Sequence, residues 1–165
     1  MWMVRLTAAA GVLLAGGGFG ERQAKRLSRK RQALQDAVLL LRRLQIRLKT
    51  GGGLWSEEVC AAAGDGGFQV LRFSMEIPDS LLPETFAQWY VRRADTQGLL
   101  GDAASLLQAA LICAVTREET LSQLDYYSLL LLQRLDACRQ QEERDKKLYR
   151  QLGWLGGALL AVILW

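Results

Sequence analysis

Histidine is absent from this 165-residue chain, and proline occurs only twice. The lack of histidine removes the commonest general base and the commonest metal ligand of proteins. The scarcity of proline, in a sequence rich in leucine, alanine, glutamine and arginine, is typical of an all-helical protein. The composition therefore favours an all-α fold that carries little of the chemistry used by enzymes.

Cysteine is also scarce, and Cys60, Cys113 and Cys138 form no close pair. Zinc sites use cysteines and histidines at short spacings, so this pattern argues against one. An odd, scattered set argues equally against a disulfide framework, and we interpret the three as reduced packing residues of a cytosol-facing domain. We expect no enzymatic activity, no cofactor, no metal and no small-molecule substrate.

The charged residues divide the chain into a basic, an acidic and a balanced stretch. Residues Glu21–Lys49 hold ten Lys and Arg against two acids, whereas Thr50–Thr116 hold three against eight. Residues Arg117–Arg150 carry seven of each sign. The simplest use of this division is internal, so we expect the acidic middle of the chain to face the basic helix before it.

Both ends of the chain lack charge over 15 residues, in Leu6–Gly20 and in Gln151–Trp165. We predict an N-terminal transmembrane anchor over residues 1–20 and a C-terminal one over residues 151–165. Basic residues follow the first segment and precede the second, as is typical of cytoplasmic flanks. Residues 21–150 are therefore predicted to form a cytoplasmic helical bundle.

A secretory signal peptide is the competing interpretation of the N-terminal segment. A single basic residue, Arg5, precedes the apolar run, and this fits a signal peptide. The basic residues between Arg22 and Arg31 do not fit, because they lie where the positive-inside rule places a cytoplasmic flank. An uncleaved anchor is the preferred interpretation.

Residues Glu21–Lys49 are predicted to form one amphipathic helix, because apolar residues recur there at helical spacing. Their basic side chains have several interpretations: a solvated face that also sets topology, a contact with anionic lipid, or a contact with an acidic protein partner. Nucleic acid is not expected, since no aromatic residue interleaves the charges. The candidate protein or lipid interface consists of Arg22, Arg26, Arg29, Lys30, Arg42 and Arg43.

Short helices are predicted between the basic helix and the last third of the chain. The glycine-rich Thr50–Gly53 is interpreted as a helix stop, because a phosphate loop would need a preceding strand and a following Gly-Lys-Ser/Thr. A capping box at Thr116-Arg-Glu-Glu119 predicts a long helix from Thr116 to Trp165. The short helices are expected at Ser56–Ala63 with Ser56 as cap, Phe68–Glu76, Leu82–Ala94, and Ala103–Val115 with Asp102 as cap.

Two further features indicate contacts between helices. The run Leu129–Leu132 is too wide for one buried seam, so one side of it is expected to contact another neighbour or a partner protein. Gly-x-x-x-Gly pairs occur in both predicted membrane segments and allow close approach of their backbones. The glycines predicted to support this packing are Gly16, Gly20, Gly153 and Gly157.

The expected architecture is a cytoplasmic bundle of about six helices, flanked by an N-terminal and a C-terminal transmembrane helix. Two short spans are too few to enclose a pore. This favours a membrane platform or scaffold that presents charged helix faces to other subunits. The alternative is a membrane-surface regulatory protein whose basic helix binds anionic lipid.

The order of these elements, and above all the closing motif Lys147-Leu-Tyr-Arg-x-Leu-Gly-x-Leu-Gly-Gly157, resembles the stage III sporulation protein AB family. The resemblance covers the whole chain. It departs at Gln45-Ile46 and Gly53-Leu54, where family members often have Glu-Ile and Pro-Leu.

The resemblance implies an endospore-forming bacterium and the mother-cell membrane that faces the forespore. It implies a place among the stage III proteins AA to AH, whose secretion-like complex links the two cells. The AB protein is similar to the platform protein of type II secretion and type IV pilus systems. By that analogy it docks the AA ATPase from the cytoplasmic side and has the other stage III subunits and membrane lipid as partners.

The two interpretations of the N-terminus predict different mature proteins. An uncleaved anchor leaves Met1 as the first residue, whereas removal of a signal peptide leaves a new N-terminus near Gly20. N-terminal sequencing of the protein purified from cell membranes measures this directly. A start near Gly20 would contradict the predicted anchor and support export of the chain.

Overall fold

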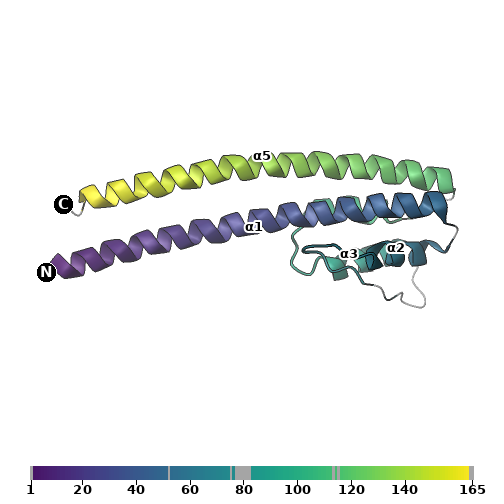
Figure 1. Cartoon of the computed structure of the whole chain (residues 1–165), viewed down its shortest axis with the longest axis horizontal. Coiled ribbons are helices and arrows are strands. Elements are labelled where there is room, and N and C mark those ends of the chain that lie inside the picture. The colour runs from purple at the N-terminus through teal and green to yellow at the C-terminus, as the bar shows by residue number, and fades with distance from the viewer. Residues whose placement is uncertain are drawn as a thin grey trace. The chain divides into compact units, whose positions relative to one another are not determined.

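The computed structural model describes the backbone of residues 2–51, 53–74, 76, 83–112, 114 and 116–163. Within these ranges it describes the side chains of all residues except 2–24, 146 and 149–163. Over this part of the chain the fold is all-helical and contains no strand, so the predicted all-α class is confirmed (Figure 1). The helices are α1 (Trp2–Thr50), α2 (Trp55–Gly64), α3 (Pro83–Ala94), α4 (Ala103–Ala110) and α5 (Arg117–Ile163).

The chain divides into two compact units. One unit contains the N-terminal part of α1, up to Ser28, and the C-terminal part of α5, from Cys138 onward. The other, Arg29–Ala137, is called the bundle here and contains the rest of these helices together with α2, α3 and α4. Within the bundle, α2 and α3 lie beside the C-terminal part of α1 (Figure 1).

No helix in the described part of the chain is both long and apolar enough to cross a membrane. The transmembrane helices predicted over residues 1–20 and 151–165 are therefore not confirmed. Each rests on an uncharged stretch of 15 residues. A spanning helix needs about 20 predominantly apolar residues.

The helix termini confirm some predicted signals and correct others. The capping box is present, with the Thr116 amide donating to Glu119 Oε2 at 3.3 Å and the Glu119 amide donating to Thr116 Oγ1 at 3.2 Å. Ser56 is not a cap, because α2 begins one residue earlier with Leu54 at the N-cap position. Asp102 is wrong as a side-chain cap, since its backbone is helical (φ −61°, ψ −23°) and its carboxylate makes no capping bond. A cap residue normally needs an extended backbone to aim its side chain at the first turn.

The helix predicted over Phe68–Glu76 is wrong, because residues 68–74 form a non-helical loop. Its apolar side chains are nevertheless used: Phe68 packs edge-on against Phe73 at 4.7 Å between centroids, and Phe73 stacks on Tyr90 of α3 at 5.7 Å. The predicted helix Ala103–Val115 is shorter than expected, since α4 ends at Ala110. The part of the chain that the structure describes thus has five helices where about six were expected.

The Asp36 carboxylate of α1 holds this loop in place. It is 3% exposed and accepts hydrogen bonds from the amides of three consecutive residues, Gln69 at 3.0 Å, Val70 at 2.8 Å and Leu71 at 2.9 Å. A buried carboxylate is tolerated when backbone N–H groups satisfy its oxygens. These amides cannot also donate within a helix, which explains why the sequence pattern of 68–76 was misleading.

Side-chain hydrogen bonds join the helices around the core of the bundle. Trp55 Nε1 donates to the carbonyl of Leu111 at 2.8 Å, which ties α2 to the end of α4, and Gln123 Nε2 donates to Ala109 O at 2.8 Å, which ties α5 to α4. Gln45 Nε2 donates to Asp125 Oδ1 at 2.8 Å between α1 and α5. Among the described residues, the large side chains that are fully buried are Leu34, Leu40, Leu41, Leu44, Val59, Tyr90, Leu100, Leu107, Leu111, Leu124 and Leu131.

Tyr90 occupies the centre of the aromatic part of this core, stacked on Phe86 and Phe73 with Trp89 beside it. Its hydroxyl is buried, and no described residue accepts or donates a hydrogen bond there. Burial raises the pKa of the Tyr90 phenol well above its ordinary value, and a negative charge at Cys60 would raise it further. Burial also raises the pKa of the Cys60 thiol.

Replacing Asp36 with Ala is expected to lower the free energy of unfolding by about 3 kcal/mol, because the amides of Gln69, Val70 and Leu71 lose their acceptor. Urea unfolding of the full-length chain, followed by circular dichroism, measures this change. The matched control is Asp125→Ala, which removes one exposed hydrogen bond to Gln45 and is expected to cost less than about 1 kcal/mol. Equal losses in the two variants would contradict the role assigned to Asp36.

Tyr90 is expected to make the fold sensitive to alkali. The raised pKa in the folded state means that its contribution to stability is complete below the ordinary phenol value of 10.0 and is lost as the pH rises above it. Urea unfolding at about pH 8 and about pH 11 should therefore show a smaller loss of stability in Tyr90→Phe than in the wild type. Tyr126→Phe alters an exposed phenol and should retain the wild-type loss. An unchanged loss in Tyr90→Phe would contradict this account.

Candidate functional site

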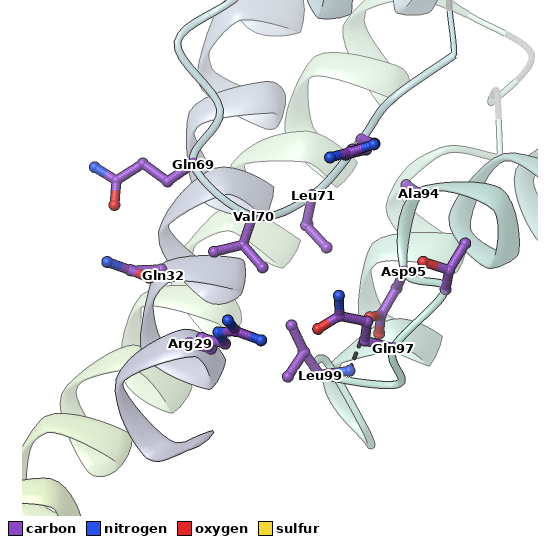
Figure 2. Close-up of a pocket in the computed structure, with 11 residues that line it drawn as sticks. Arg29, Gln32, Gln69, Val70, Leu71, Ala94, Asp95, Gln97 and Leu99 are labelled. Carbon is purple, nitrogen blue, oxygen red and sulfur yellow. Dashed lines mark hydrogen bonds between the residues drawn. The ribbon is translucent and has the colours of Figure 1, made fainter. Parts of the chain in front are cut away.

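A pocket of about 500 Å³ opens on the bundle where α1, the loop 68–74 and the turn after α3 meet. Figure 2 shows Arg29 and Gln32 on the α1 side, Gln69 to Leu71 on the loop, and Asp95, Gln97 and Leu99 on the turn. The full lining consists of Arg29, Gln32, Gln69, Val70, Leu71, Arg72, Ala94, Asp95, Thr96, Gln97 and Leu99.

Both irregular walls of this pocket are fixed by carboxylates. Asp36 holds the loop wall through three amides, as described above. On the other wall Asp95 accepts bonds from the amides of Leu99 and Leu100, each at 2.8 Å. Gly98 completes that turn with a φ of 63°, in the left-handed region that glycine adopts without strain. The pocket therefore has a defined backbone although two of its three walls are not helical.

The two irregular walls are also joined to each other. The amide of Arg72 donates to the carbonyl of Ala94 at 3.3 Å. This bond lies one residue after Leu71, whose amide is held by Asp36. The backbone at Arg72 is therefore fixed by two hydrogen bonds, one at the amide of Leu71 and one at its own amide. These bonds fix the point from which the Arg72 side chain extends at the pocket.

The residues that line the pocket carry a net positive charge, because Arg29 and Arg72 outnumber Asp95. Asp95 is the acidic residue of the lining, and its two oxygens are engaged by backbone amides. Arg29 and Arg72 are exposed, and neither guanidinium has an acidic or hydrogen-bonding partner among the described residues. Such a site is suited to holding an anion by charge and hydrogen bonding.

The six basic residues predicted from the sequence separate into different environments. Arg26, Arg29, Lys30 and Arg42 are exposed on α1, and the side chain of Arg22 lies outside the described residues. Arg43 is half-buried and turns inward, where it donates to the carbonyl of Gly66 and lies over the Phe68 ring at 5.1 Å. Of the five whose side chains are described, Arg29 alone lines the pocket.

The expected contact between the basic helix and the acidic middle of the chain includes an ion pair between described residues. Arg47 of α1 forms an ion pair with Asp65, at the C-terminal end of α2, with 3.0 Å between Nη2 and Oδ1. Together with Arg43 it attaches the segment after α2 to α1. The C-terminal half of the basic helix is thus partly used inside the fold, whereas Arg26, Arg29 and Lys30 face outward.

The glycines Gly16, Gly20, Gly153 and Gly157 lie in α1 and α5, but their side-chain surroundings are outside the described residues, so their packing stays a prediction. In the run Leu129–Leu132, Leu131 is buried and Leu129 is exposed, and the contact expected for the outer side of the run stays a prediction. Within the described residues, no group of His, Cys, Asp or Glu is placed to hold a metal ion.

Sequence reasoning missed Asp36, Arg72 and Asp95. Asp36 carries a recognisable signal, because it is an acid flanked by the buried Leu34, Ala37 and Val38 on the core side of a helix. Arg72 and Asp95 carry none, since an isolated charge in a polar loop has the same appearance whether or not it lines a pocket.

Comparison with known proteins identifies the family of the chain. No curated protein and no solved structure matches it. A family model described as stage III sporulation protein AB matches residues 5–165, nearly the whole sequence. This agrees with the resemblance carried by the closing motif that begins at Lys147. The chain belongs to the stage III sporulation protein AB family.

Proposed function

We propose that this chain is a non-enzymatic platform or scaffold component of the stage III sporulation AA–AH complex, the secretion-like channel that links mother cell and forespore. Family membership connects the chain to stage III of sporulation and to partners among sporulation proteins. In this proposal the ends of α1 and α5 attach the chain to the mother-cell membrane, and the bundle faces the cytoplasm, where it docks the AA ATPase.

The observation that carries the proposal is the outward basic surface at the start of the bundle. Arg29 and Lys30, the first basic residues of the bundle, are exposed on α1, whereas the basic residues nearer its C-terminal end are partly engaged within the fold. Exposed charge that does not stabilise the fold is available to select and orient a partner. A docking role uses this surface without requiring catalytic groups.

The same surface supports an alternative, a membrane-surface regulator that binds anionic lipid through α1. The side chains described for α1 begin with a basic group that lies close in sequence to the predicted membrane segment. This group contains Lys25, Arg26, Arg29 and Lys30. Each basic residue near an anionic membrane surface contributes about 1 kcal/mol of attraction, which salt screens. Lipid binding that falls steeply with salt, in a protein that purifies alone, would favour this alternative.

Reversing two charges tests the assembly role. The variant Arg29→Glu/Lys30→Glu is expected to reduce co-purification of other stage III subunits from sporulating-cell membranes in mild detergent. Helicity and melting should be unchanged, because both side chains are exposed. Circular dichroism and thermal unfolding of the purified variant measure these controls.

Two results would count against this proposal. Recovery of the wild-type chain alone, with lipid but without a nucleotide-binding subunit or other small membrane proteins, would remove the assembly role. Loss of folding in the double variant would show that Arg29 and Lys30 act within the protein, and the basic surface would then not be a docking surface.

A further inference from the structure

The positive pocket allows a more specific inference about what the bundle recognises, and this inference rests on the proposed assembly role. Arg29 and Arg72 come from sequence positions that are far apart, and they line one pocket. Arg29 is placed by α1, and Arg72 is placed by a loop that is fixed at Leu71 by Asp36 and at its own amide by Ala94. Two exposed guanidinium groups that line one cavity are suited to binding an anion.

Neither arginine pairs with a carboxylate among the described residues, although Asp95 lines the same cavity. Asp95 directs its two oxygens to the amides of Leu99 and Leu100, and Asp36 directs its oxygens to the loop. The remaining polar lining consists of neutral groups, the amides of Gln32, Gln69 and Gln97 and the hydroxyl of Thr96. These groups can orient a bound carboxylate without adding negative charge.

We propose that this pocket holds a carboxylate-bearing segment of a protein partner. The planar fork of a guanidinium matches a carboxylate with two parallel hydrogen bonds. Pockets for small molecules are mostly apolar and enclose their ligand. Here Arg29, Arg72, Thr96 and Gln97 are exposed, so affinity must come partly from contacts beyond the pocket, as an extended protein segment provides.

Peptide binding to the full-length chain in detergent tests this inference. The probe is a fluorescein-labelled hexaglutamate peptide, with hexaglutamine as the neutral control, and binding is measured by fluorescence anisotropy. The pocket variant is Arg29→Gln/Arg72→Gln, and the matched control is Arg26→Gln/Lys30→Gln. The control removes the same charge from exposed positions that do not line the pocket.

We expect hexaglutamate to bind in preference to hexaglutamine. The pocket variant should weaken binding by about tenfold or more, because charge-assisted hydrogen bonds are lost, and the control variant by less than about threefold. Far-UV circular dichroism should be the same in all three proteins, since the substituted side chains are exposed. This pattern would support a local carboxylate site at Arg29 and Arg72.

Three results would overturn the inference. Equal losses in the two variants would show that diffuse basic charge attracts the peptide. Binding of hexaglutamate that does not exceed that of hexaglutamine would remove the carboxylate site. Sedimentation with phosphatidylglycerol vesicles that fails only in the pocket variant, while its peptide binding is unchanged, would assign Arg29 and Arg72 to the membrane.

The outcomes also separate this inference from the proposed function. If wild-type protein recovers stage III subunits but the pocket variant binds hexaglutamate as well as the wild type does, the assembly role stands and the pocket assignment fails. If peptide binding depends on the pocket but the chain purifies alone, the pocket assignment stands and the assembly role fails.

Discussion

The burial of one carboxylate against a loop organises the bundle. Asp36 lies on the core side of α1 and is almost inaccessible to solvent, so its oxygens need partners from within the protein. Three consecutive amides of the loop 68–74 supply them, and the loop gives up helical hydrogen bonding to do so. The position of Phe73 on Tyr90 and the position of Arg72 at the pocket follow from this attachment.

The basic residues of α1 serve two purposes along one helix. Toward its C-terminal end, Arg43 and Arg47 hold the segment after α2 through a carbonyl and a carboxylate. Toward the start of the bundle, Arg29 and Lys30 are exposed. The charge asymmetry of the sequence is therefore explained only in part by internal pairing. The outward portion of the charge is what the proposed docking role requires.

Local patterns predicted most of the fold. The capping box at Thr116, the glycine stop after Thr50 and the regular leucine spacing of α1 depend on neighbouring residues, so they can be recognised in the sequence. The closing motif likewise identified the family, and the family model confirms it. Helical spacing of apolar residues was not sufficient by itself to predict a helix. Phe68, Leu71 and Met75 have the spacing of one helical face, yet the described part of that segment is a loop.

The pocket could not be predicted in the same way. It forms where residues from α1, the loop and the turn after α3 converge, and no local pattern connects Arg29 with Arg72 or Asp95. The sequence identified Arg29 as one of six basic candidates but gave no reason to separate it from Arg42. Only the three-dimensional arrangement distinguishes a residue that lines a cavity from one on a solvated face.

Residue-resolved hydrogen exchange of the wild-type chain tests the central claim, that the Asp36 carboxylate holds the loop. The account predicts that the amides of Gln69, Val70 and Leu71 exchange at least about tenfold more slowly than those of the exposed turn residues Thr96 and Gln97. Exchange of all five amides at similar rates would contradict it, because the loop would then not be held by Asp36 in solution.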